Sequence, residues 1–396
     1  MLISPLLSFF IALREWKSSY AKSVFIGVIV FIGMTALPEG DLEHYQAFYY
    51  YNANQSLDTM WYNLISLKDG KFYISLLSFL FGLIFQHHTV YFGFLYFIFG
   101  YYLVNFVYLV YDYNKVIVAT QWGGFLFISF ALFFSIRNSL SLAFYTGAIF
   151  IIFYLTKAIL QSNTKLLLPI LLAPLFHFAL AIVFIPIILF FFLKSKTYVC
   201  VVLVLISYLI PQTLVTGSLG DLANDANGTL VEKKYKSYAS EDGSERLNER
   251  YAEGALNANF KLSLLNNIKD LIFNYLINIG LVLLFFFRKK FNKDTLLLNY
   301  YNLILLLWAV ANIMLNVSNG VRYQIFPMVL SVAFFIFLFK NKTTKLLSYY
   351  YILTFPILLL YGLMSLYASN KFISTNFFVS NYFIEIILPT NHEKSY

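Results

Sequence analysis

Long, continuous apolar segments, separated by short basic ones, dominate this sequence. The chain is 60% hydrophobic and contains 44 Phe, which is more apolar surface than a water-soluble core of 396 residues requires. In lipid every backbone polar group must be satisfied internally, so a spanning segment is a helix or part of a closed barrel. Because the apolar residues run continuously rather than alternating, the sequence predicts helices, and hence an all-α, polytopic integral membrane protein.

We expect a single transmembrane domain over residues 1–396, with about ten to twelve membrane helices. The net charge of +9 does not indicate a nucleic-acid partner, because the basic residues lie in short segments between apolar ones, where the positive-inside rule puts them. The one cysteine, Cys200, excludes a disulfide framework and a cysteine metal site. The expected apolar helices are 3–13, 23–37, 72–85, 89–110, 116–134, 140–155, two short helices within 166–193, 198–210, 271–287, 296–315, 324–339 and 346–366, with an interfacial segment at 377–388.

The basic residues also set the direction of each crossing. Those at 14–22 mark a cytoplasmic loop, so the next segment crosses outward and residues 38–71 form a first extracytoplasmic loop. Segment 72–85 is short for a span of about 20 residues, and we expect it to dip into the outer leaflet and return. If it crossed, Lys115 and Lys157 would fall outside, against the charge rule.

The segment 166–193 has basic residues on both flanks, so both of its ends are expected on the cytoplasmic side. Pro169, Pro174 and Pro186 interrupt it, and His177 lies near its middle. Proline is tolerated in membrane helices where neighbouring groups satisfy the freed carbonyls. The sequence therefore predicts two short, tilted or broken helices that meet at His177.

Residues 212–269 are the one long polar segment, which we interpret as an extracytoplasmic loop, partly helical around 245–258. Loops of this length often serve as lids or substrate platforms, although a solvated flexible loop has the same composition.

The run EGDLEHYQAFYYY follows the first outward span and concentrates acidic residues in a chain that is only 12% charged. Carboxylates such as Glu39, Asp41 and Glu43 are costly to desolvate at the mouth of a membrane helix. Tyr45 and Tyr49 follow Asp41 at a spacing that puts all three side chains on one face of a helix. The alternative is a solvated loop with interfacial tyrosines.

The predicted topology brings Asp41, Arg137, His177 and Arg322 to the outer side. The two arginines break the pattern of cytoplasmic basic residues. Because a guanidinium is always charged and binds phosphate oxygens in bidentate fashion, the pair suits a pyrophosphate headgroup at the membrane surface. The alternatives are side chains that snorkel to the interface and structural ion pairs.

Asp41 is the candidate general base, since a hydroxyl that attacks an anomeric carbon must lose its proton. A single base suits an inverting displacement, whereas retaining chemistry usually needs a second carboxylate as nucleophile. Glu39 and Glu43 are the alternative acids. The candidate roles of His177 are a hydrogen-bond donor to a phosphate and a secondary acid, with a structural packing residue as the alternative. The adjacent histidines at 87–88 have no third ligand at useful spacing, so we expect neither a metal nor another cofactor.

Four motifs together resemble the EpsG-like, Wzy-type exopolysaccharide and O-antigen polymerases of bacteria. They are the D-x3-Y-x3-Y run that begins at Asp41, IRNSLSLAF around Arg137, LFHFAL around His177 and NGVRYQIF around Arg322 and Tyr323. The order of elements is also similar to membrane glycosyltransferases of the GT-C type.

The resemblance implies that repeat units carried on undecaprenyl pyrophosphate are joined at the outer face of the bacterial plasma membrane. By it, the arginines hold the donor pyrophosphate, Asp41 activates the acceptor hydroxyl, and the tyrosines offer stacking surface and hydroxyls to sugars. No Asp-x-Asp pair occurs in this loop, so we expect a metal-independent reaction. The implied substrate-binding set is Arg137, Arg322, Tyr45, Tyr49 and Tyr323, and the implied catalytic set is Asp41, Glu39 and His177.

Two other functions stay open from the sequence. A ligase or another lipid-linked-sugar transferase would share the lipid carrier and differ in the acceptor. A transporter for the same lipid-linked sugars would need ionisable residues along the midplane and often an internal repeat, which the sequence lacks. Membrane lipids are expected partners, and the resemblance leaves open a chain-length regulator protein.

Overall fold

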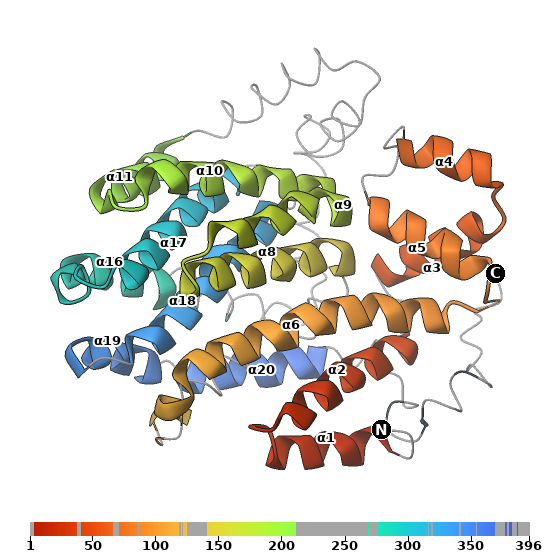
Figure 1. Ribbon diagram of the computed structural model, residues 1–396, viewed down its shortest axis with the longest axis horizontal. Coiled ribbons are helices and arrows are strands. Elements are labelled where there is room, and N and C mark those ends of the chain that lie inside the picture. The colour runs from red at the N-terminus through yellow and green to blue at the C-terminus, as the bar shows by residue number, and fades with distance from the viewer. Residues whose placement is uncertain are drawn as a thin grey trace, which may run out of the picture.

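The computed structural model describes residues 4–37, 41–65, 71–85, 87–118, 120, 122–124, 141–210, 268, 276–315, 317, 320–339, 342–353, 355–368, 377, 380–381 and 386. These residues form helices and no β-strand, as the sequence predicts (Figure 1). The first part of the chain contains α1 (Pro5–Arg14), α2 (Ser19–Met34), α3 (Asp41–Ala53), α4 (Leu57–Ile65), α5 (Phe72–Gly82), α6 (Thr89–Val118) and α8 (Leu142–Leu160).

The second part combines long helices with short 3-10 turns. Its elements are η2 (Thr164–Leu172), α9 (Ala173–Phe176), η3 (Phe178–Val183), α10 (Phe184–Leu193), α11 (Thr197–Leu209), α16 (Asn278–Phe286), η5 (Arg288–Lys290), α17 (Thr295–Met314), η6 (Gly320–Gln324), α18 (Ile325–Leu338), α19 (Lys342–Leu353) and α20 (Phe355–Ala368).

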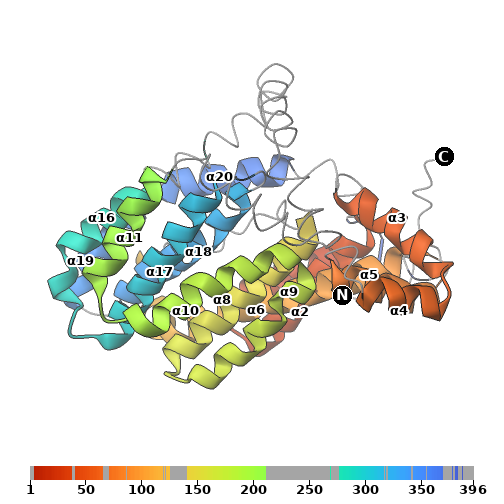
Figure 2. The ribbon, with the colours of Figure 1, turned by 90° about the horizontal axis from the view of Figure 1, so that it is seen from above.

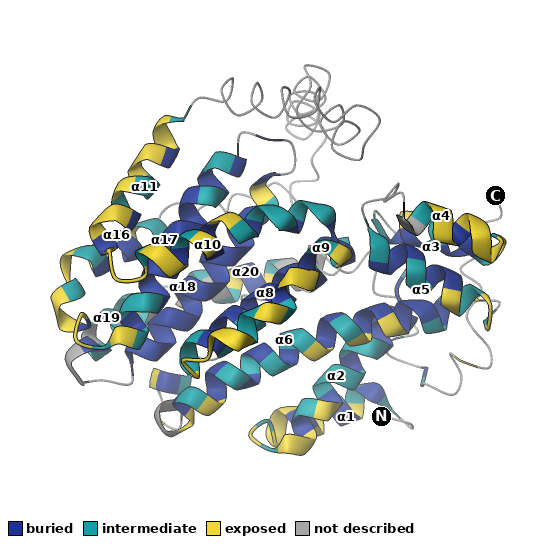
Figure 3. Cartoon of the chain, turned by 45° about the horizontal axis from the view of Figure 1, so that its top comes forward, coloured by how far each residue is buried: buried dark blue, intermediate teal, exposed yellow. Residues whose placement is uncertain are grey.

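Four of the described helices are long and apolar enough to cross a membrane: Thr89–Lys115, Leu142–Leu160, Thr295–Met314 and Gly320–Leu338. Six shorter apolar helices accompany them. Large apolar side chains also face outward, as on α10 and α11, where Phe192 is 72% and Leu209 is 80% exposed (Figure 3). An apolar exterior suits lipid as the surrounding medium. The prediction of a helical membrane protein is thus confirmed in outline, while the count of ten to twelve spans stays a prediction.

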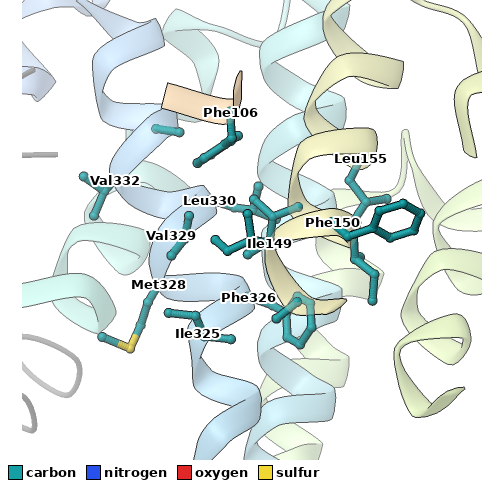
Figure 4. Packing of buried hydrophobic residues seen from close by; sticks show 14 of the residues in the cluster. Phe106, Ile149, Phe150, Leu155, Ile325, Phe326, Met328, Val329, Leu330 and Val332 are labelled. Carbon is teal, nitrogen blue, oxygen red and sulfur yellow. The ribbon is translucent and has the colours of Figure 1, made fainter. Parts of the chain in front are cut away.

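The centre of the bundle is a layer of apolar side chains from α6, α8 and α18 (Figure 4). Phe106, Ile149, Phe150, Phe326 and Val329 are all buried in it. A helix that is apolar on every side, as α18 is, must be covered by other helices or by lipid. Figure 3 shows α17 and α18 as the most continuously buried helices, with exposed residues gathered on the peripheral ones.

Helices α2 and α6 pack antiparallel through glycine. A Cβ on Gly33 would lie 2.5 Å from the ring of Tyr96, and one on Gly93 would lie 2.7 Å from the side chain of Met34. Without a hydrophobic force between helices in lipid, close backbone approach at small residues supplies much of the packing energy.

Contacts between helices gather the basic segments at one end of the bundle. Tyr108 Oη in α6 donates to the carbonyl of Trp16, in the α1–α2 turn, at 2.6 Å. Near the end of α6, the ring of Tyr113 packs on Phe337 of α18, and Phe337 also contacts Tyr300 near the start of α17. One end of the bundle therefore contains the start of α2, the ends of α6 and α18 and the start of α17. These four helices have the relative directions that the sequence predicts, and their sidedness in a membrane stays a prediction.

Helix α5 stays beside α3 and does not reach that basic end (Figure 2). Lys71 Nζ, just before α5, lies 4.9 Å from the centre of the Tyr45 ring. The Tyr49 hydroxyl donates to the carbonyl of Phe85, just after α5. Both ends of α5 thus contact α3, and the expectation that 72–85 does not cross the membrane stays a prediction. The described residues of the expected loop 38–71 are largely helical, in α3 and α4.

The helical path through 166–193 breaks at His177, as the sequence predicts. The His177 backbone is extended, with φ −157° and ψ 121°, between α9 and η3. Pro169 lies inside η2 and Pro174 opens α9. Proline removes a donor from the i to i−4 ladder, and the tighter 3-10 turns of η2 and η3 are a common consequence near such breaks.

Other boundaries differ from the expected ones. Helix α6 continues to Val118, so the first residues of the span expected at 116–134 belong to the preceding helix. Helices α19 and α20 together cover the expected span 346–366. The described residues of 119–134 are only Thr120, Trp122, Gly123 and Gly124. Those of 212–269 and 377–388 are only Ile268, Phe377, Ser380, Asn381 and Ile386.

We expect Gly33→Leu to destabilise the protein by about 1–3 kcal/mol, because the new side chain would overlap the Tyr96 ring. Thermal unfolding of the detergent-solubilised protein measures the change. Ser23→Leu is the matched control, since it adds a similar bulk to an exposed position of the same helix. Equal stability of the two variants would contradict close packing of α2 on α6.

Candidate functional site

The site forms where α3 meets the first turn of α8. Ser141, the residue before α8, donates from Oγ to Asp41 Oδ2 at 2.6 Å. One helical turn further along α3, the Tyr45 hydroxyl accepts the backbone N–H of Ala143 at 3.3 Å. The first N–H groups of a helix have no partner within it. Tyr45 thus caps α8, and Asp41, on the same face of α3, holds the Ser141 side chain, with its carboxylate at the positive end of the α8 dipole.

The capping arrangement at Ser141 is unusual. A serine before a helix normally accepts from an N–H of the first turn, but Ser141 makes no such bond. Its hydroxyl is used to hold Asp41, and Tyr45 takes over the capping of Ala143. The orientation of the carboxylate is therefore fixed by a residue that is 100 positions away in the sequence.

Tyr45 remains protonated well above neutral pH. Burial raises the pKa of its hydroxyl far above the ordinary value, and the charge of Asp41 raises it further. The N–H of Ala143 and the positive charge of Arg322 oppose this shift without overcoming it. Contacts with the first turn of α8 place both charges at the same end of the bundle: α3 bonds Ser141 and Ala143, and Tyr323, next to Arg322, packs on Phe144.

The opposite side of the α8 turn carries the other predicted motifs. The Phe144 ring meets the His177 ring edge-on at 5.6 Å and the Tyr323 ring edge-on at 5.4 Å, measured between centroids. The Tyr323 hydroxyl donates to the carbonyl of Ala179, two residues after His177. His177 is buried, and its Nδ1 accepts the N–H of Ala179 at 3.3 Å. The structure thus brings three of the four sequence motifs onto one turn of α8.

Arg322 lies in η6, directly after a tight approach of η6 to α17. A Cβ on Gly320 would lie 1.6 Å from the Met314 carbonyl oxygen, so only glycine fits there. The Arg322 side chain is half-exposed, and among the described residues it forms no hydrogen bond or ion pair. Asp41 likewise has no ion pair within the described part of the chain. A guanidinium without a carboxylate partner is available to bind an anion.

Several residues of the site were not predicted. Lys71 places its ammonium over the Tyr45 ring, and Ser141 binds Asp41. Lys71 could have been noticed as a lysine on the expected outer side, against the charge rule. Ser141 precedes an apolar run, which is an N-cap signal. Ser141 and Phe144 both lie within the IRNSLSLAF motif, which gave neither of them a role, because a phenylalanine within an apolar helix looks like any core residue.

The other predicted residues are placed as follows. Tyr45 and Tyr49 are 0% and 1% exposed, so neither ring presents a free face for a sugar in this structure. Glu43 is exposed on α3, away from the face that contacts α8. Glu39 and Arg137 lie outside the described residues. Their predicted roles stay predictions.

Within the described residues, no three histidine, cysteine, aspartate or glutamate side chains gather where they could hold a metal ion. No family model, curated protein or solved structure matches this chain. The functional proposal therefore rests on the residues of the site.

We expect Tyr45→Phe to destabilise the protein by about 1–2 kcal/mol, because the buried N–H of Ala143 would lose its acceptor. Thermal unfolding in detergent measures the loss. Tyr51→Phe, at an exposed position of the same helix, is the control and should have no effect. If both variants unfold at the temperature of the unmodified protein, the Tyr45 hydroxyl does not cap α8.

Proposed function

We propose that this chain is a membrane glycosyltransferase of the GT-C type, a polymerase that joins undecaprenyl-pyrophosphate-linked oligosaccharides. The observation that carries the proposal is the pair of Asp41 and Arg322, which lie at one end of the bundle without an ion pair to each other. A carboxylate held by Ser141 and an uncommitted guanidinium match the two charges that such a transfer must handle. The order of motifs around them supports the same class.

Asp41 would act as general base. The acceptor hydroxyl loses its proton to the carboxylate as its oxygen attacks the anomeric carbon of the donor. The bond between that carbon and the pyrophosphate oxygen breaks, and the electron pair leaves with the lipid pyrophosphate. The Ser141 hydroxyl holds one carboxylate oxygen, Oδ2, which leaves Oδ1 to take the proton.

Arg322 would stabilise the leaving group. Negative charge grows on the pyrophosphate oxygen as the bond breaks, and a preorganised cation in a water-poor site stabilises such charge effectively. Lys71, whose ammonium lies over the Tyr45 ring, would supply a second cation. Arg137, from the predicted set, would contribute a third. His177 and Tyr323 would position η3 and η6 around them.

The distribution of charge supports the orientation that this function requires. Apart from Lys71 and Arg322, the lysines and arginines of the described residues lie toward the end of the bundle opposite Asp41, and the positive-inside rule assigns that end to the cytoplasm. The site would then face the outside of a bacterial plasma membrane, with the protein inserted as a multi-pass polymerase.

We expect Asp41→Asn to abolish polymerisation, with a rate loss of about 10²–10⁴-fold for the missing base. The test is complementation of a strain that lacks its own polymerase, followed by gel analysis of the surface polysaccharide. The variant should give single repeat units in place of a ladder, at normal abundance in the membrane. Asp58→Asn, an exposed carboxylate on α4, is the control and should leave the ladder intact.

A full ladder from Asp41→Asn would overturn Asp41 as the base and turn attention to Glu39 and Glu43. Transfer of single units by the unmodified protein, with no ladder in its cognate background, would indicate a ligase instead.

We expect Arg322→Gln to reduce polymerisation by about 10²–10³-fold, because a charge that stabilises the leaving group is lost. Arg322→Lys should retain part of the activity, since it keeps the charge but loses the bidentate geometry. Arg14→Gln, at the opposite end of the bundle, is the charge-matched control. Equal activity of Arg322→Gln and the control would contradict a role in donor binding.

A further inference from the structure

The end of the bundle opposite Asp41 brings two basic segments together that lie about 90 residues apart in the sequence. Arg288 of η5 donates a hydrogen bond to the hydroxyl of Tyr198, at the start of α11. Its guanidinium carbon lies 4.5 Å from the Tyr198 ring centre and 4.4 Å from that of Phe285, and Nη1 donates to the Phe285 carbonyl at 2.8 Å. This contact joins the α10–α11 turn to the end of α16, and α11 and α16 lie side by side in Figures 1 and 2.

The cations at this junction greatly outnumber the carboxylates. The one acidic residue of the two segments, Asp294, accepts the N–H groups of Leu296 and Leu297 and so caps α17. All five lysines of the junction are exposed, and none forms an ion pair within the described residues. The basic residues of the junction are Lys194, Lys196, Arg288, Lys289, Lys290 and Lys293.

The two segments are held by contacts other than charge pairs. Asn302 Nδ2 of α17 donates to the Lys194 carbonyl at 2.7 Å, which fixes the α10–α11 turn against the bundle. The Arg288 guanidinium lies against the rings of Tyr198 and Phe285. It donates hydrogen bonds to the Tyr198 hydroxyl and to the Phe285 carbonyl. The positive charge is therefore concentrated at a defined place. Such a concentration of like charge is costly unless an anion covers it.

The surface next to these cations is apolar. Phe192 is 72%, Phe286 is 69% and Tyr198 is 63% exposed, all on helices that adjoin the junction. A ligand that matches this surface needs a negative head and apolar chains. This combination favours a lipid over an acidic protein, because exposed aromatic rings below a basic rim suit acyl chains below a phosphate.

We propose that this junction binds the headgroup of an anionic phospholipid, with its phosphate among the lysines and its acyl chains against α10, α11 and α16. This site is separate from Asp41 and Arg322 and is independent of the function proposed for them. By holding α11 to α16, the bound lipid would stabilise the half of the bundle that contains α17.

Native mass spectrometry of the full-length protein, purified in neutral detergent, tests the proposal by titration with phosphatidylglycerol and, separately, phosphatidylcholine. The test variant replaces Lys194, Lys196, Lys289 and Lys290 with glutamine. We expect phosphatidylglycerol to bind the unmodified protein at least about tenfold more tightly than phosphatidylcholine, and the variant to lose about tenfold or more of that affinity.

The matched control replaces Lys17, Lys115, Lys157 and Lys165 with glutamine, which removes the same charge from other segments at the same end. It should keep the preference for phosphatidylglycerol. An equal loss in the control, or no preference for phosphatidylglycerol by the unmodified protein, would overturn the proposal. Thermal unfolding of both variants, and of the Lys289→Gln, Lys290→Gln double variant, ensures that folded protein is compared.

Discussion

The structure depends on one constraint, which is that backbone N–H and C=O groups at helix ends and breaks need partners where water is scarce. Long helices such as α6, α8, α17 and α18 satisfy their own backbones, but their ends do not. At the end of the bundle that contains Asp41, side chains supply the hydrogen-bond partners for these backbone groups. Tyr45 accepts an N–H of α8, His177 accepts an N–H of η3, and Tyr49 and Tyr323 donate to carbonyls after α5 and within η3.

These same bonds position the candidate site. Each capping residue belongs to one of the four sequence motifs. Tyr45 holds α3 against the α8 turn, Tyr49 holds the end of α5 against α3, and Tyr323 holds η6 against η3. Asp41 and Arg322 cap no backbone group within the described residues. There, the Asp41 carboxylate accepts a hydrogen bond from Ser141. The separation is physically sensible, because groups that cap the backbone are committed, whereas a base and an anion-binding cation must be available to substrate.

The two ends of the bundle differ in the number and arrangement of their charged side chains. At one end, Asp41 and Arg322 form no ion pair within the described residues and lie near buried tyrosines. At the other end, exposed lysines crowd the junction of α10, α11 and α16. An apolar bundle joins them, with α8 and α18 packed tightly at its centre. By our two proposals, the ends bind different anions, a reacting pyrophosphate at one and a lipid headgroup at the other.

The sequence by itself determined the all-helical, apolar class, the opposite directions of successive long helices and the break at His177. These follow from local properties: continuous apolar runs, the position of lysines and the spacing of three prolines. Only the tertiary structure decided that Tyr45 caps α8, that Ser141 holds Asp41 and that Lys194 and Arg288 share a junction. Each of these contacts joins residues about 90 or more positions apart, and local pattern carries no information about which distant helix end a side chain will meet.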